Sequence, residues 1–231
     1  MALLPPDRLF PADPQTREIA RTLYQSVAAK PIISPHGHTD PRWFAENKPF
    51  ADPAQLFITP DHYVFRMLFS QGISLESLGV PRADGGWTET DGRKIWRIFA
   101  ENYYLFRATP SRMWLDHAFQ DVFGLTTPIT AATADETYDH LADCLTRPEF
   151  SPRALFNRFN IEAIATTESP LDDLRWHAMI RDSGWDFDTA ILYSRAKTND
   201  WTDNRISSTL FYYMPNPAGG RSEYSADPDY L

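Results

Sequence analysis

The sequence PIISPHGH, residues 31–38, places a short apolar run directly before two histidines. Its β-branched residues Ile32 and Ile33 predict a short buried strand. A second apolar and β-branched run, IEAIATT at residues 161–167, predicts another buried strand that leads into a helix. A strand, a long helical stretch, and then a strand followed by a helix are typical of an α/β fold.

His36 and His38 flank a glycine at the end of the first predicted strand. Residues i and i+2 of a strand point to the same side, so the two imidazoles are expected to project together. Two neighbouring imidazoles suit zinc or manganese, and the active residues of parallel barrels gather where strands end. The pattern favours a metal or substrate site, and the alternative is a chance pair of histidines on a loop.

Five pairs of an N-cap residue and a proline predict where helices begin. The cap side chain accepts a hydrogen bond from a backbone N–H of the first turn, and a proline at the first helical position needs no N–H. Apolar residues recur at helical spacing after these pairs, so residues 37–160 are expected to be mainly helical. The pairs are Asp13-Pro14, Thr59-Pro60, Thr109-Pro110, Ser151-Pro152 and Ser169-Pro170.

The triplet Asp61-His62-Tyr63 follows one of these pairs, in the first turn of a predicted helix. A helix N-terminus carries a partial positive charge and free N–H groups, which suit an anion. His62 and Tyr63 can both hydrogen-bond a sugar acid, so they are candidate substrate-binding residues. The alternative is that Asp61 only caps the helix while Tyr63 packs.

Composition narrows the classes of function. The chain has 231 residues, of which 42% are hydrophobic, and a formal net charge of -9. Nucleic-acid binding needs clustered cations, so an acidic surface argues against it. The one cysteine, Cys144, cannot form an intramolecular disulfide. The sequence shows no secretory signal and no apolar run of membrane-spanning length. We expect a cytoplasmic protein without a nucleic-acid or membrane partner.

The order of four motifs resembles that of the uronate isomerases, a family of the amidohydrolase superfamily. The likeness covers roughly residues 10–185, and the four motifs follow one another in the family's order with suitable gaps. They are the His-x-His strand at residues 32–38; Asp61-His62-Tyr63 with Arg66 and Gly72; Trp114, His117 and Phe123-Gly124; and TTESPLDDL at residues 166–174 with His177.

The resemblance implies the N-terminal part of a distorted (β/α)8 TIM-type barrel. Residues 1–36 and 161–185 would supply barrel elements, residues 37–160 a mainly helical insertion between strands 1 and 2, and residues 186–231 a divergent tail. The implied reaction converts D-glucuronate to D-fructuronate, and D-galacturonate to D-tagaturonate. It moves a proton between C2 and C1 through an enediol.

Residue roles follow from the same resemblance. His36 and His38 match metal-site histidines, while His62 and Tyr63 match residues that contact the substrate. The implied cofactor is a divalent metal, zinc or manganese, which the resemblance does not make indispensable. The implied partner is a small-molecule uronate, and both a homo-oligomer and a missing C-terminal half stay open.

Parts of the family pattern have no counterpart here. The family's third strand ends in an Arg-Pro-Asp-like motif whose arginine cannot be placed, because Arg195 stands in a different context. The acid–base residues are also unmatched, so the catalytic residues are unknown. A (β/α)8 barrel needs about 250 residues without insertions. A chain of 231 residues with a long insertion therefore predicts an incomplete barrel, with weak or no activity by itself.

Two other functions stay open. A metal-dependent hydrolase of the same superfamily would share His36 and His38 but would not need the Asp61-His62-Tyr63 triplet. A non-catalytic helical remnant would use the helical stretch of residues 89–160 as its functional body.

Overall fold

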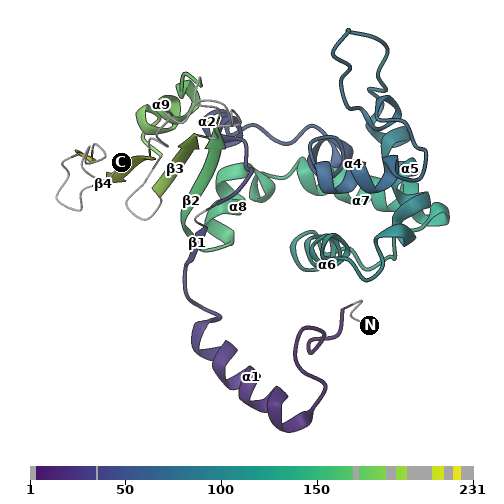
Figure 1. The fold of residues 1–231 in the computed structure, drawn as a ribbon, viewed down its shortest axis with the longest axis horizontal. Helices are drawn as coiled ribbons and strands as arrows, with labels where there is room; N and C mark the ends of the chain where they lie inside the picture. The colour runs from purple at the N-terminus through teal and green to yellow at the C-terminus, as the bar shows by residue number, and fades with distance from the viewer. Residues whose placement is uncertain are drawn as a thin grey trace, which may run out of the picture. The chain divides into compact units, whose positions relative to one another are not determined.

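The computed structural model describes residues 4–34, 36–168, 172–185, 191–196, 210–215 and 221–224 (Figure 1). The chain divides into two compact units. The helical unit comprises Met1–Tyr24 and Pro49–Ser151, and the sheet unit comprises Gln25–Lys48 and Pro152–Leu231. Helix α1 (Pro14–Val27) runs across the boundary between them.

Helices and single helical turns make up the described regular structure of the helical unit after α1. Its α-helices are α3 (Pro53–Phe57), α4 (His62–Phe69), α5 (Gly92–Asn102), α6 (Pro110–His117) and α7 (Ala134–Leu145). A π-helical turn, η3 (Ala118–Val122), continues α6. The 3-10 turns are η1 (Glu76–Leu78), η2 (Tyr103–Phe106), η4 (Ala131–Thr133) and η5 (Pro148–Phe150).

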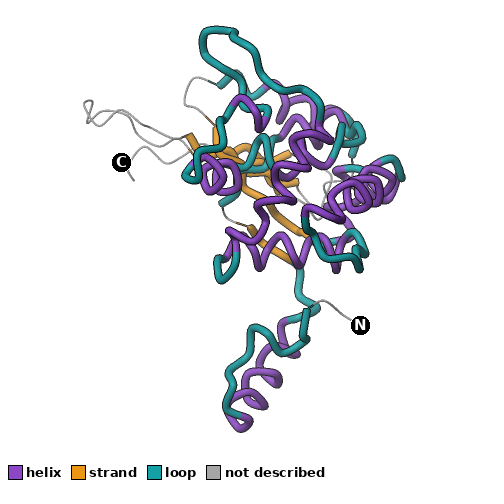
Figure 2. The backbone as a smooth tube through the Cα atoms, turned by 90° about the vertical axis from the view of Figure 1, so that its right-hand side faces the viewer, coloured by secondary structure: helices purple, strands orange, loops and turns teal. Residues whose placement is uncertain are grey.

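The described strands of the sheet unit form one sheet, in the order β1-β2-β3-β4-β5 (Figure 2, orange). The strands are β1 (Ile32–Ser34), β2 (Ile161–Glu168), β3 (Ile191–Ala196), β4 (Leu210–Pro215) and β5 (Arg221–Tyr224). The first three run parallel, and β4 and β5 continue the sheet antiparallel. Helices α2 (Pro41–Glu46), α8 (Pro152–Arg158) and α9 (Arg175–Asp182) belong to the same unit. The described chain is thus a helix-rich α/β structure with an unclosed sheet.

The expected helix starts are confirmed where the cap and the proline act locally. Helices α1, α6 and α8 begin at Pro14, Pro110 and Pro152, as predicted. In α6 the Thr109 hydroxyl accepts a hydrogen bond from the backbone N–H of Arg112 at 3.1 Å. These starts depend on contacts within one turn, so the sequence alone predicts them.

The predicted start at Thr59-Pro60 is wrong. Helix α4 begins at His62, and Asp61 is its N-cap. The Thr59 hydroxyl donates a hydrogen bond to the Leu78 carbonyl at 2.9 Å, so it is not used as a cap. For the fifth pair, residues 169–171 lie outside the described residues, and the helix that follows begins at Arg175.

The predicted burial of the first strand is also wrong. Strand β2 is largely buried, but Ile32 and Ile33 of β1 are 48% and 63% exposed. Among the described strands, β1 pairs with β2 alone and forms an edge of the sheet. An edge strand of three residues has one neighbour to shield it, so its apolar side chains stay accessible.

Aromatic side chains fill the core of the helical unit. Trp96 and Phe99 of α5 are fully buried with Tyr103 and Phe106, which follow in η2. The ring centroids of Phe99 and Tyr103 lie 4.9 Å apart. The indole N–H of Trp96 donates to the Thr137 hydroxyl of α7 at 3.1 Å, which satisfies a buried polar group and joins the two helices.

The core of the sheet unit joins its helices to β2. Phe44 of α2, Phe156 of α8, Ile164 of β2 and Ile180 of α9 form one buried cluster. The rings of Phe44 and Phe156 meet edge to face, with centroids 5.6 Å apart. In Figure 1, α8 lies beside β2, in agreement with this packing. Among the described residues, no helix is both long enough and apolar enough to span a membrane.

We expect Phe99→Ala to destabilise the helical unit by about 3–5 kcal/mol, because it leaves a cavity among buried rings. Tyr104→Ala is the matched control, since the Tyr104 side chain is 56% exposed. Its expected effect is within about 0.5 kcal/mol. Urea denaturation followed by tryptophan fluorescence measures both, and equal losses in the two variants would contradict this account of the core.

Candidate functional site

The segment His36-Gly37-His38 follows the end of β1 at the carboxyl end of the parallel strands. It lies in irregular chain after Ser34 rather than inside the strand, which corrects the expectation of a His-x-His on β-structure. The two imidazole rings nevertheless meet, with centroids 5.2 Å apart and planes at 83°. Both histidines are exposed, so the pair is open to a small ligand.

Hydroxyl groups hold the backbone between the two histidines. Thr167 of β2 donates a hydrogen bond from its hydroxyl to the Gly37 carbonyl at 2.9 Å. Ser34 donates a longer one to the His36 carbonyl at 3.4 Å. A Cβ atom at position 37 would lie 3.4 Å from the Ala165 carbonyl oxygen. Thus the chain after β1 stays close against β2.

The donor type and spacing of His36 and His38 fit a divalent metal as part of a ligand set. Two imidazoles bound to one tetrahedral zinc at about 2.0–2.1 Å would have ring centroids about 5 Å apart. The observed 5.2 Å agrees with that value. Within the described ranges, no group of three or more His, Cys, Asp or Glu side chains is arranged for a metal ion. In a larger ligand set, the pair would supply two of the donors.

A buried polar cluster lies at the end of β2, and its residues belong to the sequence motif of residues 166–174 with His177. The Thr166 hydroxyl and His177 Nε2 of α9 are 2.9 Å apart. Glu168 Oε1 lies 3.5 Å from the same nitrogen. Glu168 is 8% exposed, and neither of its carboxylate oxygens forms a hydrogen bond in the described structure. In the sequence, this cluster is indicated by a glutamate at the end of an apolar strand and a histidine on the helix that follows.

Burial lowers the pKa of His177, because the imidazolium loses its water shell; the carboxylates of Glu168 and Asp172 act in the opposite direction. The folded chain therefore holds the neutral imidazole more strongly than the unfolded chain does. Together with Thr166, this imidazole ties α9 to the carboxyl end of β2.

His62 and Tyr63 occupy the first turn of α4 in the helical unit. Their ring centroids are 4.2 Å apart. Asp61 Oδ1 accepts hydrogen bonds from the backbone N–H groups of Tyr63 and Val64, at 2.8 and 3.4 Å. The capping carboxylate occupies these donors, so the expectation of free N–H groups for an anion is wrong. Tyr63 does not pack inside, because it is 58% exposed beside Trp114, with centroids 6.5 Å apart.

The two candidate pairs thus belong to different units. His36 and His38 lie in the sheet unit, whereas His62 and Tyr63 lie in the helical unit. Within each pair the rings are in contact range. The convergence of the two pairs on one ligand stays a prediction.

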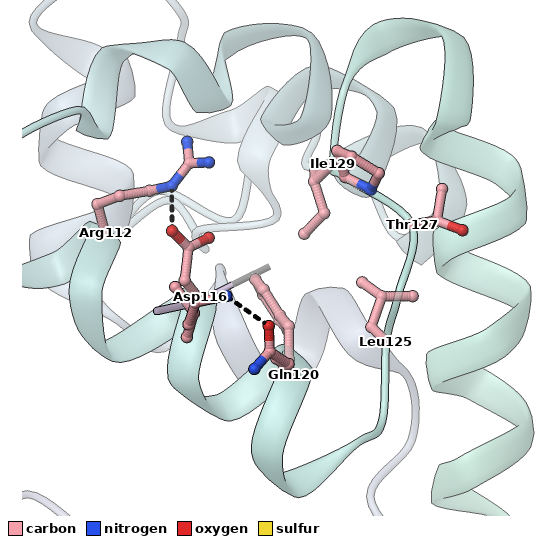
Figure 3. A pocket seen from close by; sticks show the side chains of 9 residues that line it. Arg112, Asp116, Gln120, Leu125, Thr127 and Ile129 are labelled. Atoms are coloured by element: carbon pink, nitrogen blue, oxygen red, sulfur yellow. Dashed lines mark hydrogen bonds and ion pairs between the residues drawn. The ribbon is translucent and has the colours of Figure 1, made fainter. Parts of the chain in front are cut away.

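A separate cavity of about 130 Å³ lies inside the helical unit (Figure 3). Arg112 and Asp116 stand on one side of it and form an ion pair at 2.7 Å. The Arg112 guanidinium also donates to the Tyr103 carbonyl at 3.1 Å. Its charge is matched locally, which makes it a poor anchor for a substrate carboxylate. The remaining lining residues are Leu4, Phe119, Gln120, Leu125, Thr127, Pro128 and Ile129.

Parallel strands separated by a long helical excursion, with a histidine pair at their carboxyl end, define an α/β protein with a candidate metal-binding sheet edge. The chain belongs to the glucuronate isomerase family, whose model matches residues 14–194. A uronate isomerase from Rhizobium meliloti (strain 1021) is 62% identical over 79% of this chain and 39% of its own length. One from Xanthomonas euvesicatoria pv. vesicatoria (strain 85-10) is 63% identical over 79% of this chain and 39% of its own length.

Two solved structures that resemble this chain are also named glucuronate or uronate isomerase. The crystal structure of glucuronate isomerase from Caulobacter crescentus is 52% identical, with a TM-score of 0.79, over 87% of this chain and 42% of that chain. Uronate isomerase from Thermotoga maritima, at 24% identity and a TM-score of 0.66, shares the fold over 78% of this chain and 38% of its own. This chain therefore spans about two fifths of the length of these relatives.

The lowered pKa of His177 predicts a pH dependence of folding. The stabilising contribution is present above the unfolded pKa of about 6.5 and is lost as the pH falls through the folded pKa. We expect the urea midpoint of the wild type to fall between about pH 7.5 and 5.5, and His177→Gln to flatten this dependence. The exposed His117, replaced by glutamine, is the control. Parallel curves for wild type and His177→Gln would contradict the prediction.

Proposed function

We propose that this chain forms the N-terminal portion of a uronate isomerase, built on the first strands of a distorted (β/α)8 barrel. The observation that carries the proposal is the family match over residues 14–194, with His36 and His38 adjacent at the carboxyl end of the parallel strands. Relatives with 62% and 63% identity are named uronate isomerases. The unclosed parallel strands support a barrel that needs further strands to close.

In this proposal the sheet unit supplies barrel elements from residues 1–36 and 161–185. Residues 37–160 form a mainly helical insertion, and residues 186–231 a divergent tail. The separate aromatic core of the helical unit supports an inserted body that packs by itself.

The proposed substrate is a hexuronate, isomerised between aldose and ketose forms, D-glucuronate to D-fructuronate and D-galacturonate to D-tagaturonate. His62 and Tyr63 are proposed to contact it, because both rings lie at the start of α4 and Tyr63 is largely exposed. His36 and His38 are proposed to hold a divalent metal, zinc or manganese. When bound, such an ion polarises an oxygen of the substrate.

The reaction also needs groups that move a proton between C2 and C1. We assign that role to no side chain of this chain, and its catalytic residues stay unknown. The proposed contribution of these residues is to bind and orient the sugar acid, while proton transfer depends on a more complete barrel.

A chimera tests the proposal directly. Residues 14–194 of this chain replace the matching segment of the Rhizobium meliloti uronate isomerase. We expect the chimera to convert D-glucuronate to D-fructuronate, followed by NMR, and His36→Ala or His62→Ala to lower kcat/KM by at least about tenfold. The 231-residue chain assayed alone is expected to show little or no turnover.

Ester and lactone substrates are assayed beside the uronates. A folded chimera that hydrolyses these compounds but isomerises no uronate would support the hydrolase alternative. A folded chimera with neither activity, and with no binding of uronate or Zn²⁺ by calorimetry, would support the non-catalytic remnant.

A further inference from the structure

At the carboxyl end of β2, the side chains of two neighbouring threonines point to opposite faces of the sheet. Thr166 is fully buried and faces α9, where its hydroxyl meets His177 Nε2 at 2.9 Å. Thr167 points to the other face of the sheet, as strand alternation requires. Its hydroxyl meets the Gly37 carbonyl at 2.9 Å. The strand end is thus fixed to the helix layer on one side and to the histidine segment on the other.

The hydrogen bond from Thr167 reaches the residue between the two histidines. Gly37 separates His36 from His38, so fixing its carbonyl fixes the peptide plane that leads into His38. The ladder between β1 and β2 ends with Ser34 opposite Ile164. Beyond that point, the Thr167 hydroxyl connects Gly37 to β2 through a hydrogen bond.

We propose that Thr167 is a positioning residue for the His36–His38 pair. By holding the Gly37 carbonyl, it keeps the two imidazoles at the separation that suits a shared divalent metal. This inference rests on the proposed metal role of the two histidines. Groups that orient metal ligands commonly change metal affinity by about 10- to 100-fold when they are removed.

We expect loss of the Thr167 hydroxyl to change the orientation of His36 and His38 more than the stability of the fold. Thr167→Val keeps the β-branched shape that suits a strand and removes the donor. Thr167→Ser keeps the donor and removes a methyl group. Thr146→Val is the matched control, because the exposed Thr146 also donates its hydroxyl to a main-chain carbonyl, that of Asp143 at 2.7 Å, but lies in the helical unit.

The first measurement needs no metal. Imidazole ring resonances of His36 and His38 are recorded by ¹H–¹³C NMR in the 231-residue chain. We expect distinct, ordered ring shifts in the wild type, in Thr167→Ser and in Thr146→Val. In Thr167→Val the two sets are expected to move toward unstructured values. Should Thr167→Val fail to fold, Thr167→Ala removes the same hydroxyl with a smaller side chain.

The second measurement is Zn²⁺ affinity by calorimetry. We expect about tenfold weaker binding in Thr167→Val, and values within about threefold of wild type in Thr167→Ser and Thr146→Val. Unchanged ring shifts and Zn²⁺ affinity in a folded Thr167→Val variant would overturn the proposal. If the wild type binds no Zn²⁺ but its ring shifts still respond to Thr167→Val, the positioning role stands and the metal part of the proposed function fails.

Discussion

The parallel pairing of β1 with β2 is the constraint on which the candidate metal site depends. The hydrogen bond from Thr167 to Gly37 joins residues 130 positions apart, and it can form only when the two strands share one register. Parallel neighbours need a long crossover connection. Here that connection includes most of the helical unit. The position of the histidine pair therefore depends on the pairing of β1 with β2, and the intervening chain must allow that pairing.

The helical unit can serve as such a connection because it has a separate hydrophobic core. Buried rings of α5 and η2 pack together, and the bond from Trp96 to Thr137 joins α5 to α7 without help from the sheet. The entropic cost of closing a loop rises slowly with its length, and a folded insertion leaves fewer free residues in that loop. Such a body can therefore separate two paired strands without destabilising their pairing.

Local chemistry made much of the fold predictable. Helices α1, α6 and α8 begin where a cap residue meets a proline, since those contacts stay within one turn. The β-branched run of residues 161–167 gave β2 correctly. The strands β3 and β5 were not assigned, because strand pairing depends on distant partners that a single sequence does not show.

By itself, the sequence determined the α/β class, most of the capped helix starts and the family motifs, since each depends on residue type and short spacing. The tertiary structure decided which groups meet. It placed Thr59 against Leu78, so α4 begins at Asp61's cap instead. It also left β1 on an exposed edge and set Thr167 on the Gly37 carbonyl. The physical reason is range: a cap forms within one turn, but a hydroxyl finds a carbonyl 130 positions away only after the sheet has formed.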